Sequence, residues 1–162
     1  MIIIVSIFSF ILEFLVNYIF DGTCFFGLIV LSTLILLEPF FKKNKNLFYV
    51  YCFLMGFFYD LIYTGIYFMN AGLFLFIGFF VMVINSVTPN SFFISIFELF
   101  LLICFYRFFS FIFLSINGVI DFEFSLLFES IFCSVLINII YGIILYFILF
   151  FMSKLFNINR IN

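Results

Sequence analysis

Long apolar stretches separated by short polar turns follow one another along the whole chain. A helix needs about 20 apolar residues to cross a bilayer, because it rises about 1.5 Å per residue through a hydrocarbon layer about 30 Å thick. The pattern therefore predicts six membrane-spanning helices, over residues 2–20, 24–41, 47–62, 71–87, 91–116 and 124–151. Six such helices with short turns occupy all 162 residues. We expect one all-α integral membrane domain over residues 1–162, folded as a single helix bundle.

The composition agrees with a membrane protein. Hydrophobic residues make up 69% of the chain and charged residues 9%, and the mean hydropathy is +1.47. Soluble domains carry roughly 25% charged residues, so this chain could not cover a water-facing surface. The sequence has no histidine and none of the spacings typical of a zinc protease, a phosphate-binding loop or a serine hydrolase. We therefore expect no enzyme activity, no cofactor, no metal site and no nucleic-acid partner.

The four cysteines lie in four different apolar stretches, without the clustered spacing of a metal site or a disulfide framework. Buried cysteine behaves as a small hydrophobic residue. We interpret all four as packing residues: Cys24, Cys52, Cys104 and Cys133.

The one cluster of basic residues predicts the orientation in the membrane. Lys42, Lys43 and Lys45 follow the second apolar stretch, and loops rich in lysine and arginine face the cytoplasm. Six spans then place both termini in the cytoplasm, together with Lys154 and Arg160. The acidic residues of the turns fall on the opposite side: Asp21, Asp121 and Glu123.

Five ionisable residues lie inside the predicted spans, where a charge costs about 2.5–3.5 kcal/mol by insertion scales. They are Glu13, Asp60, Glu98, Arg107 and Glu129. From the helical rise, Asp60 lies roughly 20 Å and Arg107 roughly 24 Å from the cytoplasmic start of its own span. Asp60 and Arg107 therefore lie at similar depths in the outer half of the membrane.

Two hypotheses explain these charges. In the first, Asp60 and Arg107 form an interhelical ion pair that fixes the packing of the bundle, since polar side chains often join membrane helices. Glu98 is a poor partner for Arg107, because nine residues of helix turn it to roughly the opposite face. In the second, Asp60, Arg107 and Glu129 line a polar cavity that opens to the outer side and holds a solute or a partner's side chain.

Two stretches carry a resemblance to a known family. Residues 53–65 read FLMGFFYDLIYTG, in which Gly56, Tyr59 and Asp60 close the third predicted span. Residues 136–156 form the last apolar stretch, with Asn138 as its polar position. Together with the basic loop after the second span, these features resemble the family of the rod shape-determining protein MreD.

The resemblance implies a function without catalysis. Members of that family are multi-pass proteins of the bacterial cytoplasmic membrane that maintain rod cell shape as part of the cell-elongation machinery. It implies MreC as the direct partner, with MreB, RodA and a class B penicillin-binding protein in the same complex for peptidoglycan synthesis, and membrane lipid around the bundle.

The family's six-helix arrangement is similar to the substrate-binding subunit of energy-coupling-factor vitamin transporters, which supplies an alternative function. Such a subunit needs a solute pocket and a helix surface of small residues for docking its coupling subunit. The chain has one alanine, Ala71, and eight glycines with no Gly-x-x-x-Gly pair. The sequence therefore favours the cell-shape function over the transporter.

Overall fold

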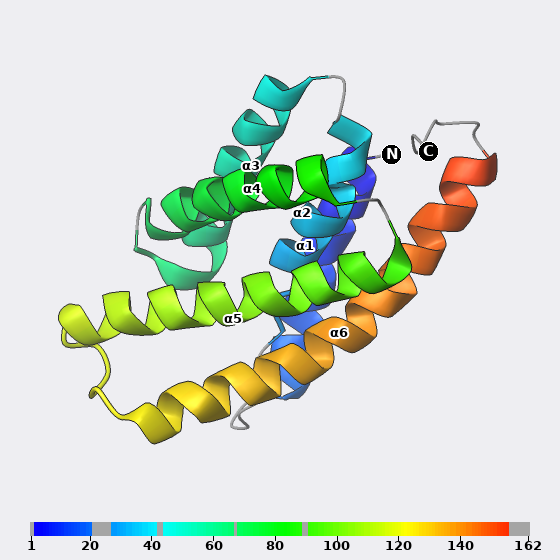
Figure 1. Cartoon of the computed structure of the whole chain (residues 1–162). Helices are drawn as coiled ribbons and strands as arrows, with labels where there is room; N and C mark the ends of the chain where they lie inside the picture. The colour runs from blue at the N-terminus through cyan, green and yellow to red at the C-terminus, as the bar shows by residue number, and fades with distance from the viewer. Residues whose placement is uncertain (1, 21–26, 42–43, 67, 89–90, 156–162) are drawn as a thin grey trace.

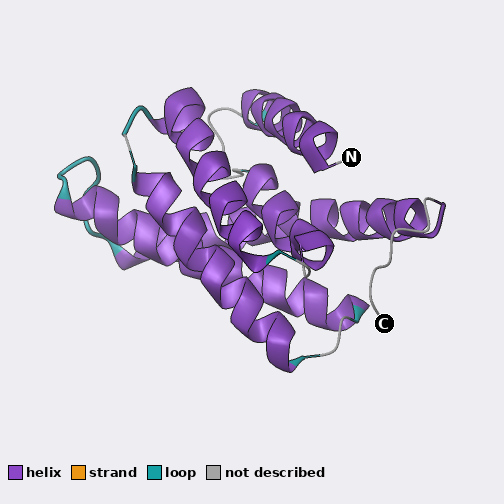
Figure 2. Cartoon of the chain, turned by 90° about the horizontal axis from the view of Figure 1, so that it is seen from above, coloured by secondary structure: helices purple, strands orange, loops and turns teal. Residues whose placement is uncertain are grey.

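The computed structural model describes residues 2–20, 27–41, 44–66, 68–88 and 91–155, and every regular element in that part of the chain is helical. Figure 2 shows these helices joined by short loops. In chain order they are α1 (Ile2–Ile19), α2 (Ile29–Leu37), the 3₁₀ helix η1 (Glu38–Phe41), α3 (Lys45–Tyr59), the π-helical turn η2 (Asp60–Thr64), α4 (Met69–Val87), α5 (Phe92–Ile116) and α6 (Phe124–Leu155).

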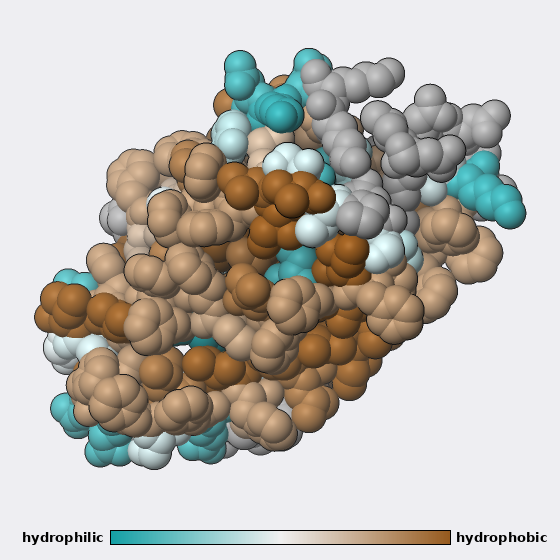
Figure 3. Space-filling view, viewed as in Figure 1, coloured by the Kyte–Doolittle hydropathy of each residue, from teal (hydrophilic) through white to brown (hydrophobic). Residues whose placement is uncertain are grey.

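Five helical segments of the described chain are long and apolar enough to cross a membrane. They are α1, α3 with η2, α4, α5 and α6, and they correspond to five of the stretches expected from the sequence. Figure 3 shows that the face turned to the viewer is mostly hydrophobic, with hydrophilic residues gathered mainly toward its ends. The structure therefore confirms that the described part of the chain is all helical, and its five long apolar helices fit a multi-pass membrane protein.

The second expected span, residues 24–41, is not among these five. Its described part consists of nine α-helical residues followed by four in a 3₁₀ helix, a length of about 20 Å that falls short of the hydrocarbon layer. Pro39 in η1 has no backbone N–H and cannot continue an α-helix. Because all nine residues of α2 are buried in the protein, the thickness of a bilayer does not set its length. The expectation of six full spans is therefore not confirmed.

The short helix α2 is the centre of the bundle. It contacts α1, α3, α4, α5 and α6, while α3 packs extensively on α4 and α5 on α6. In Figure 1 the starts of α1 and α3 and the end of α6 lie toward the upper and right side, and the α5–α6 turn lies at the lower left. Lys45 and Lys154, which belong to those upper and right ends, therefore lie on the same side of the bundle.

The cysteines differ in their environment. Cys52 and Cys104 are free, and Cys52 is fully buried in the α3–α4 interface, where a Cβ added to Gly78 would lie against its Sγ. Cys133 on α6 is disulfide-bonded, so the interpretation of this residue as a packing residue alone is wrong. Cys24 lies outside the described residues.

Candidate functional site

The carboxylate of Asp60 caps the start of another helix. Asp60 is 0% exposed and accepts hydrogen bonds from the backbone N–H of Asn70 at 3.0 and 3.1 Å and from that of Ala71 at 3.1 Å. The Asn70 side chain donates at 2.8 Å and the Thr64 hydroxyl at 3.1 Å. The N–H groups of a first helical turn have no partner within the helix and carry partial positive charge. The α4 backbone thus provides the partner that a buried carboxylate requires.

Gly56 lies one helical turn before Asp60 on the same face of α3, and it allows α4 to approach. A Cβ at this position would lie 2.5 Å from the Asn70 carbonyl oxygen and 2.6 Å from the Ala71 Cα. Both are backbone atoms that cannot rotate away. Gly56 and Asp60 therefore form one joint, in which the glycine admits the α4 backbone and the carboxylate binds its N–H groups.

The turn between η2 and α4 brings the chain back over this joint. Gly65 ends η2 with φ 65°, and Phe68 precedes α4 with φ 67°. The left-handed conformation costs a non-glycine residue about 1–2 kcal/mol, and the Phe68 ring packs on Phe57 at a centroid distance of 5.8 Å. This packing holds the strained residue in place, so that α4 begins above Asp60.

Glu13 caps the second internal helix start, that of α2. Its side chain is 0% exposed, and Oε2 accepts a hydrogen bond from the Val30 backbone N–H at 2.7 Å. The Tyr59 hydroxyl donates to Oε1 at 2.6 Å. Because Tyr59, the last residue of α3, adjoins Asp60, the first residue of η2, the two capped helix starts are linked through neighbouring residues.

Two asparagines complete the start of α2. The Leu28 N–H donates to Asn138 Oδ1 at 2.9 Å, and the Gly27 N–H donates to Asn17 Oδ1 at 2.8 Å. Asn138 is fully buried, and its own amide donates to the Ser134 carbonyl at 2.7 Å. Side chains from α1 and α6 therefore satisfy the backbone groups that a helix beginning inside the protein would leave unpaired.

Helix α5 reaches Asp60 through Tyr106. The Tyr106 hydroxyl donates to Asn70 Oδ1 at 2.6 Å, and Asn70 in turn donates to Asp60. In the described part of the chain, the groups that donate hydrogen bonds to the Asp60 carboxylate belong to Thr64, Asn70 and Ala71. The structure thus gives Asp60 helix-capping contacts, and its ion pair with Arg107 stays one of the two hypotheses from the sequence.

A polar pocket of about 320 Å³ lies between the start of α2, η2 and α5. Arg107 lines it, as do Tyr59 and Tyr106. Asp60 does not line this pocket, and Glu129 is exposed on α6. A pocket of this size lies at the lower end of the range for small-molecule sites. Its other polar lining residues are Asn17, Thr64 and Ser110.

Glu98 belongs to a separate polar cluster. It is 3% exposed, and Glu38 in η1 is 4% exposed. The Asn85 side-chain amide donates to Glu38 Oε2 at 3.0 Å and to Glu98 Oε1 at 3.4 Å. This cluster joins η1, α4 and α5, away from the joint at Asp60.

The sequence interpretation named Tyr59 and Asn138 but otherwise considered charged residues, and it therefore missed four uncharged partners. Asn70 and Tyr106 complete the Asp60 network, Asn17 caps α2, and Asn85 joins two glutamates. The available signal was an asparagine inside an apolar stretch, since a polar side chain at that depth also needs a hydrogen-bond partner.

Comparison with protein-family models, with curated proteins and with solved structures finds no match to this chain. Among the residues that the structure describes, no group of three or more His, Cys, Asp or Glu side chains is placed to hold a metal ion. The similarity to energy-coupling-factor subunits stays a prediction.

Replacing Tyr59 by phenylalanine is expected to destabilise the protein by about 1–2 kcal/mol, because a buried oxygen of Glu13 loses its hydroxyl donor. Unfolding in mixed micelles of rising SDS content measures the change. In a Glu13→Gln background the effect should be smaller, because the two residues share one hydrogen bond. Tyr18→Phe is the matched control, since Tyr18 lies at the end of α1 as Tyr59 lies at the end of α3, but Tyr18 is 74% exposed. Equal losses in both backgrounds would contradict the assignment.

Proposed function

We propose that the chain is a non-enzymatic scaffold of the bacterial cell-elongation machinery, of the MreD type, in the cytoplasmic membrane. In this role it associates with MreC, and through MreC with MreB, RodA and a class B penicillin-binding protein, to maintain rod shape. The observation that carries the proposal is the joint between Gly56 and Asp60. These two residues are the most specific part of the resemblance, and both act on the start of α4.

The rest of the bundle is consistent with a scaffold. Buried acidic side chains cap helix starts or join helices. Glu13 of α1 caps the start of α2, and Glu98 of α5 accepts a hydrogen bond from Asn85 of α4. Lys45 and Lys154 lie on one side of the bundle, which supports cytoplasmic termini under the positive-inside rule.

Depletion of the protein in its rod-shaped host tests the proposal. Cells are expected to become round, and the tagged wild-type chain is expected to co-purify with MreC. Asp60→Asn should weaken both complementation and co-purification, because an amide cannot replace the charged cap, whereas the exposed control Asp121→Asn should support both. Rods that keep their shape on depletion would rule the scaffold out.

The polar pocket favours one alternative, the substrate-binding subunit of an energy-coupling-factor vitamin transporter. Arg107→Gln would then impair growth that depends on vitamin uptake and leave cell shape unchanged. A scaffold predicts no effect of Arg107→Gln on vitamin uptake. Gene neighbourhood gives a cheaper distinction, since adjacency to the genes for MreC and MreB supports the cell-shape function.

A further inference from the structure

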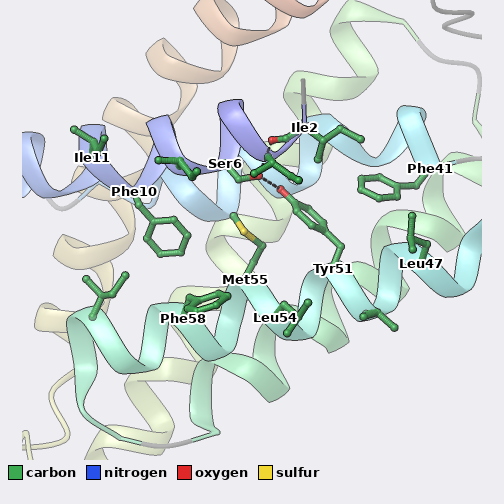
Figure 4. Close-up of a pocket in the computed structure, with 14 residues that line it drawn as sticks. Ile2, Ser6, Phe10, Ile11, Phe41, Leu47, Tyr51, Leu54, Met55 and Phe58 are labelled. Atoms are coloured by element: carbon green, nitrogen blue, oxygen red, sulfur yellow. Dashed lines mark hydrogen bonds between the residues drawn. The ribbon is translucent and has the colours of Figure 1, made fainter.

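An apolar groove of about 810 Å³ runs along the outside of the bundle between α1 and α3. One wall consists of Ile3, Ile7 and Ile11, which recur every fourth residue on α1. The other wall is a stripe on α3 and η2 that runs from Leu47 to Ile62, a distance of about 22 Å. In Figure 4, Phe10 from α1 and Met55 and Tyr51 from α3 point into the space between the two helices.

The floor of the groove needs no polar partner. Tyr51 reaches across from α3, and its hydroxyl lies 2.7 Å from Ser6 Oγ, which itself donates to the Ile2 carbonyl at 2.9 Å. The pair is drawn in Figure 4. Because these polar groups satisfy one another, an occupant gains nothing by offering a hydrogen bond there, and a hydrocarbon chain fits without cost.

The walls suit an acyl chain better than a partner helix. Close helix packing in membranes uses small residues that let two backbones approach, but the described lining contains no glycine or alanine. Leu54 and Phe58 on α3 line the groove together with Ile7 and Ile11 on α1. Such long side chains form a narrow, adaptable channel, and the volume lies within the range of sites that enclose a small molecule.

Charge at one end of the groove indicates the headgroup. Ile2, Phe41 and Leu47 form this end, where α3 begins with the exposed Lys45. The flexible stem of lysine lets its ammonium reach a nearby phosphate. The start of α3 adds partial positive charge, and its N-cap residue makes no side-chain capping bond.

We propose that the groove between α1 and α3 binds an anionic phospholipid, with an acyl chain along the groove and the phosphate beside Lys45. From the Lys45 end, a groove of about 22 Å accommodates a chain that spans one leaflet of about 15 Å. This site is independent of the cell-shape function.

Fluorescence quenching tests the site directly, because the chain has no tryptophan and one introduced tryptophan is the sole indole. The purified full-length Phe58→Trp variant is reconstituted in phosphatidylcholine vesicles that contain an equal fraction of brominated phosphatidylglycerol or brominated phosphatidylcholine. The apparent affinity for brominated phosphatidylglycerol is expected to be about fivefold higher than that for brominated phosphatidylcholine, because one lysine near an anionic headgroup contributes about 1 kcal/mol. Lys45→Gln should abolish the preference, and Lys154→Gln at the end of α6 should retain it.

Phe147→Trp is the matched control, because Phe58 and Phe147 are both 49% exposed and Phe147 lies on α6, outside the groove. Its emission should be quenched equally by the two lipids. The proposal fails if Phe58→Trp shows no preference, or if Phe147→Trp shows the same one. It also fails if neither lipid quenches Phe58→Trp while both quench Phe147→Trp, since the groove would then be closed to lipid by protein.

Discussion

Asp60→Ala is expected to destabilise the protein by about 3 kcal/mol, the largest effect of any single substitution in the polar network. The change removes the acceptor of the Asn70 and Ala71 backbone N–H groups, and each buried donor left without an acceptor costs about 1–3 kcal/mol. Asp60→Asn keeps one carbonyl oxygen and should cost less, about 1–2 kcal/mol, because it loses the charge that faces the start of α4.

Thermal unfolding in detergent measures this effect through Cys52. Cys104 is also free and only partly buried, so serine replaces it in every variant compared. The free thiol of Cys52 is fully buried, and in this background a thiol-reactive fluorescent dye reports when α3 and α4 separate. Asp121→Ala removes an exposed carboxylate in the α5–α6 turn and should leave the midpoint unchanged. If the Asp60→Ala variant unfolded at the same midpoint temperature as the wild type, the capping role of Asp60 would be wrong.

Gly56→Ala is expected to destabilise the protein by about 1–3 kcal/mol, as overpacking does when the surroundings cannot yield. The added methyl group would press on the Asn70 carbonyl oxygen and on the Ala71 Cα. Relief requires the start of α4 to move away from Asp60. The double mutant Gly56→Ala with Asp60→Asn should lose less free energy of unfolding than the sum of the two single losses, because each substitution disrupts the same joint.

Gly72→Ala provides the control for Gly56→Ala. A Cβ at Gly72 meets nothing within 4 Å, and Gly72 lies one residue beyond Ala71 in α4. Alanine stabilises an open helical position by about 0.5–1 kcal/mol relative to glycine. In the same dye assay, Gly56→Ala is expected to lower the unfolding midpoint and Gly72→Ala to raise it. A stabilising Gly56→Ala would refute the close approach of α3 and α4.

Hydropathy predicted the long helices because a stretch of lipid-facing residues is apolar throughout, as in α1 and α4. It could not predict the length of α2. An apolar residue buried in protein and one facing lipid look the same in the sequence, and all nine residues of α2 are buried. The short length follows from tertiary packing, which periodicity does not encode.

The sequence correctly marked Asp60 and Glu13 as residues that need a partner, but it could not identify the partners. Both carboxylates bind backbone N–H groups, at Asn70 and at Val30. Every residue except proline carries such a group, so only the path of the chain reveals which one faces a carboxylate. The ion-pair hypothesis for Asp60 and Arg107, which stays untested, considered side-chain charge alone and did not include the α4 backbone.

The start of α2 also imposes an order on assembly. Leu28 donates to Asn138, which follows it by 110 residues, and no water in the hydrocarbon layer can substitute for that acceptor. During synthesis, the start of α2 therefore gains this acceptor only after α6 has been inserted. We expect the central helix of the bundle to dock after the long helix that follows it by more than 80 residues.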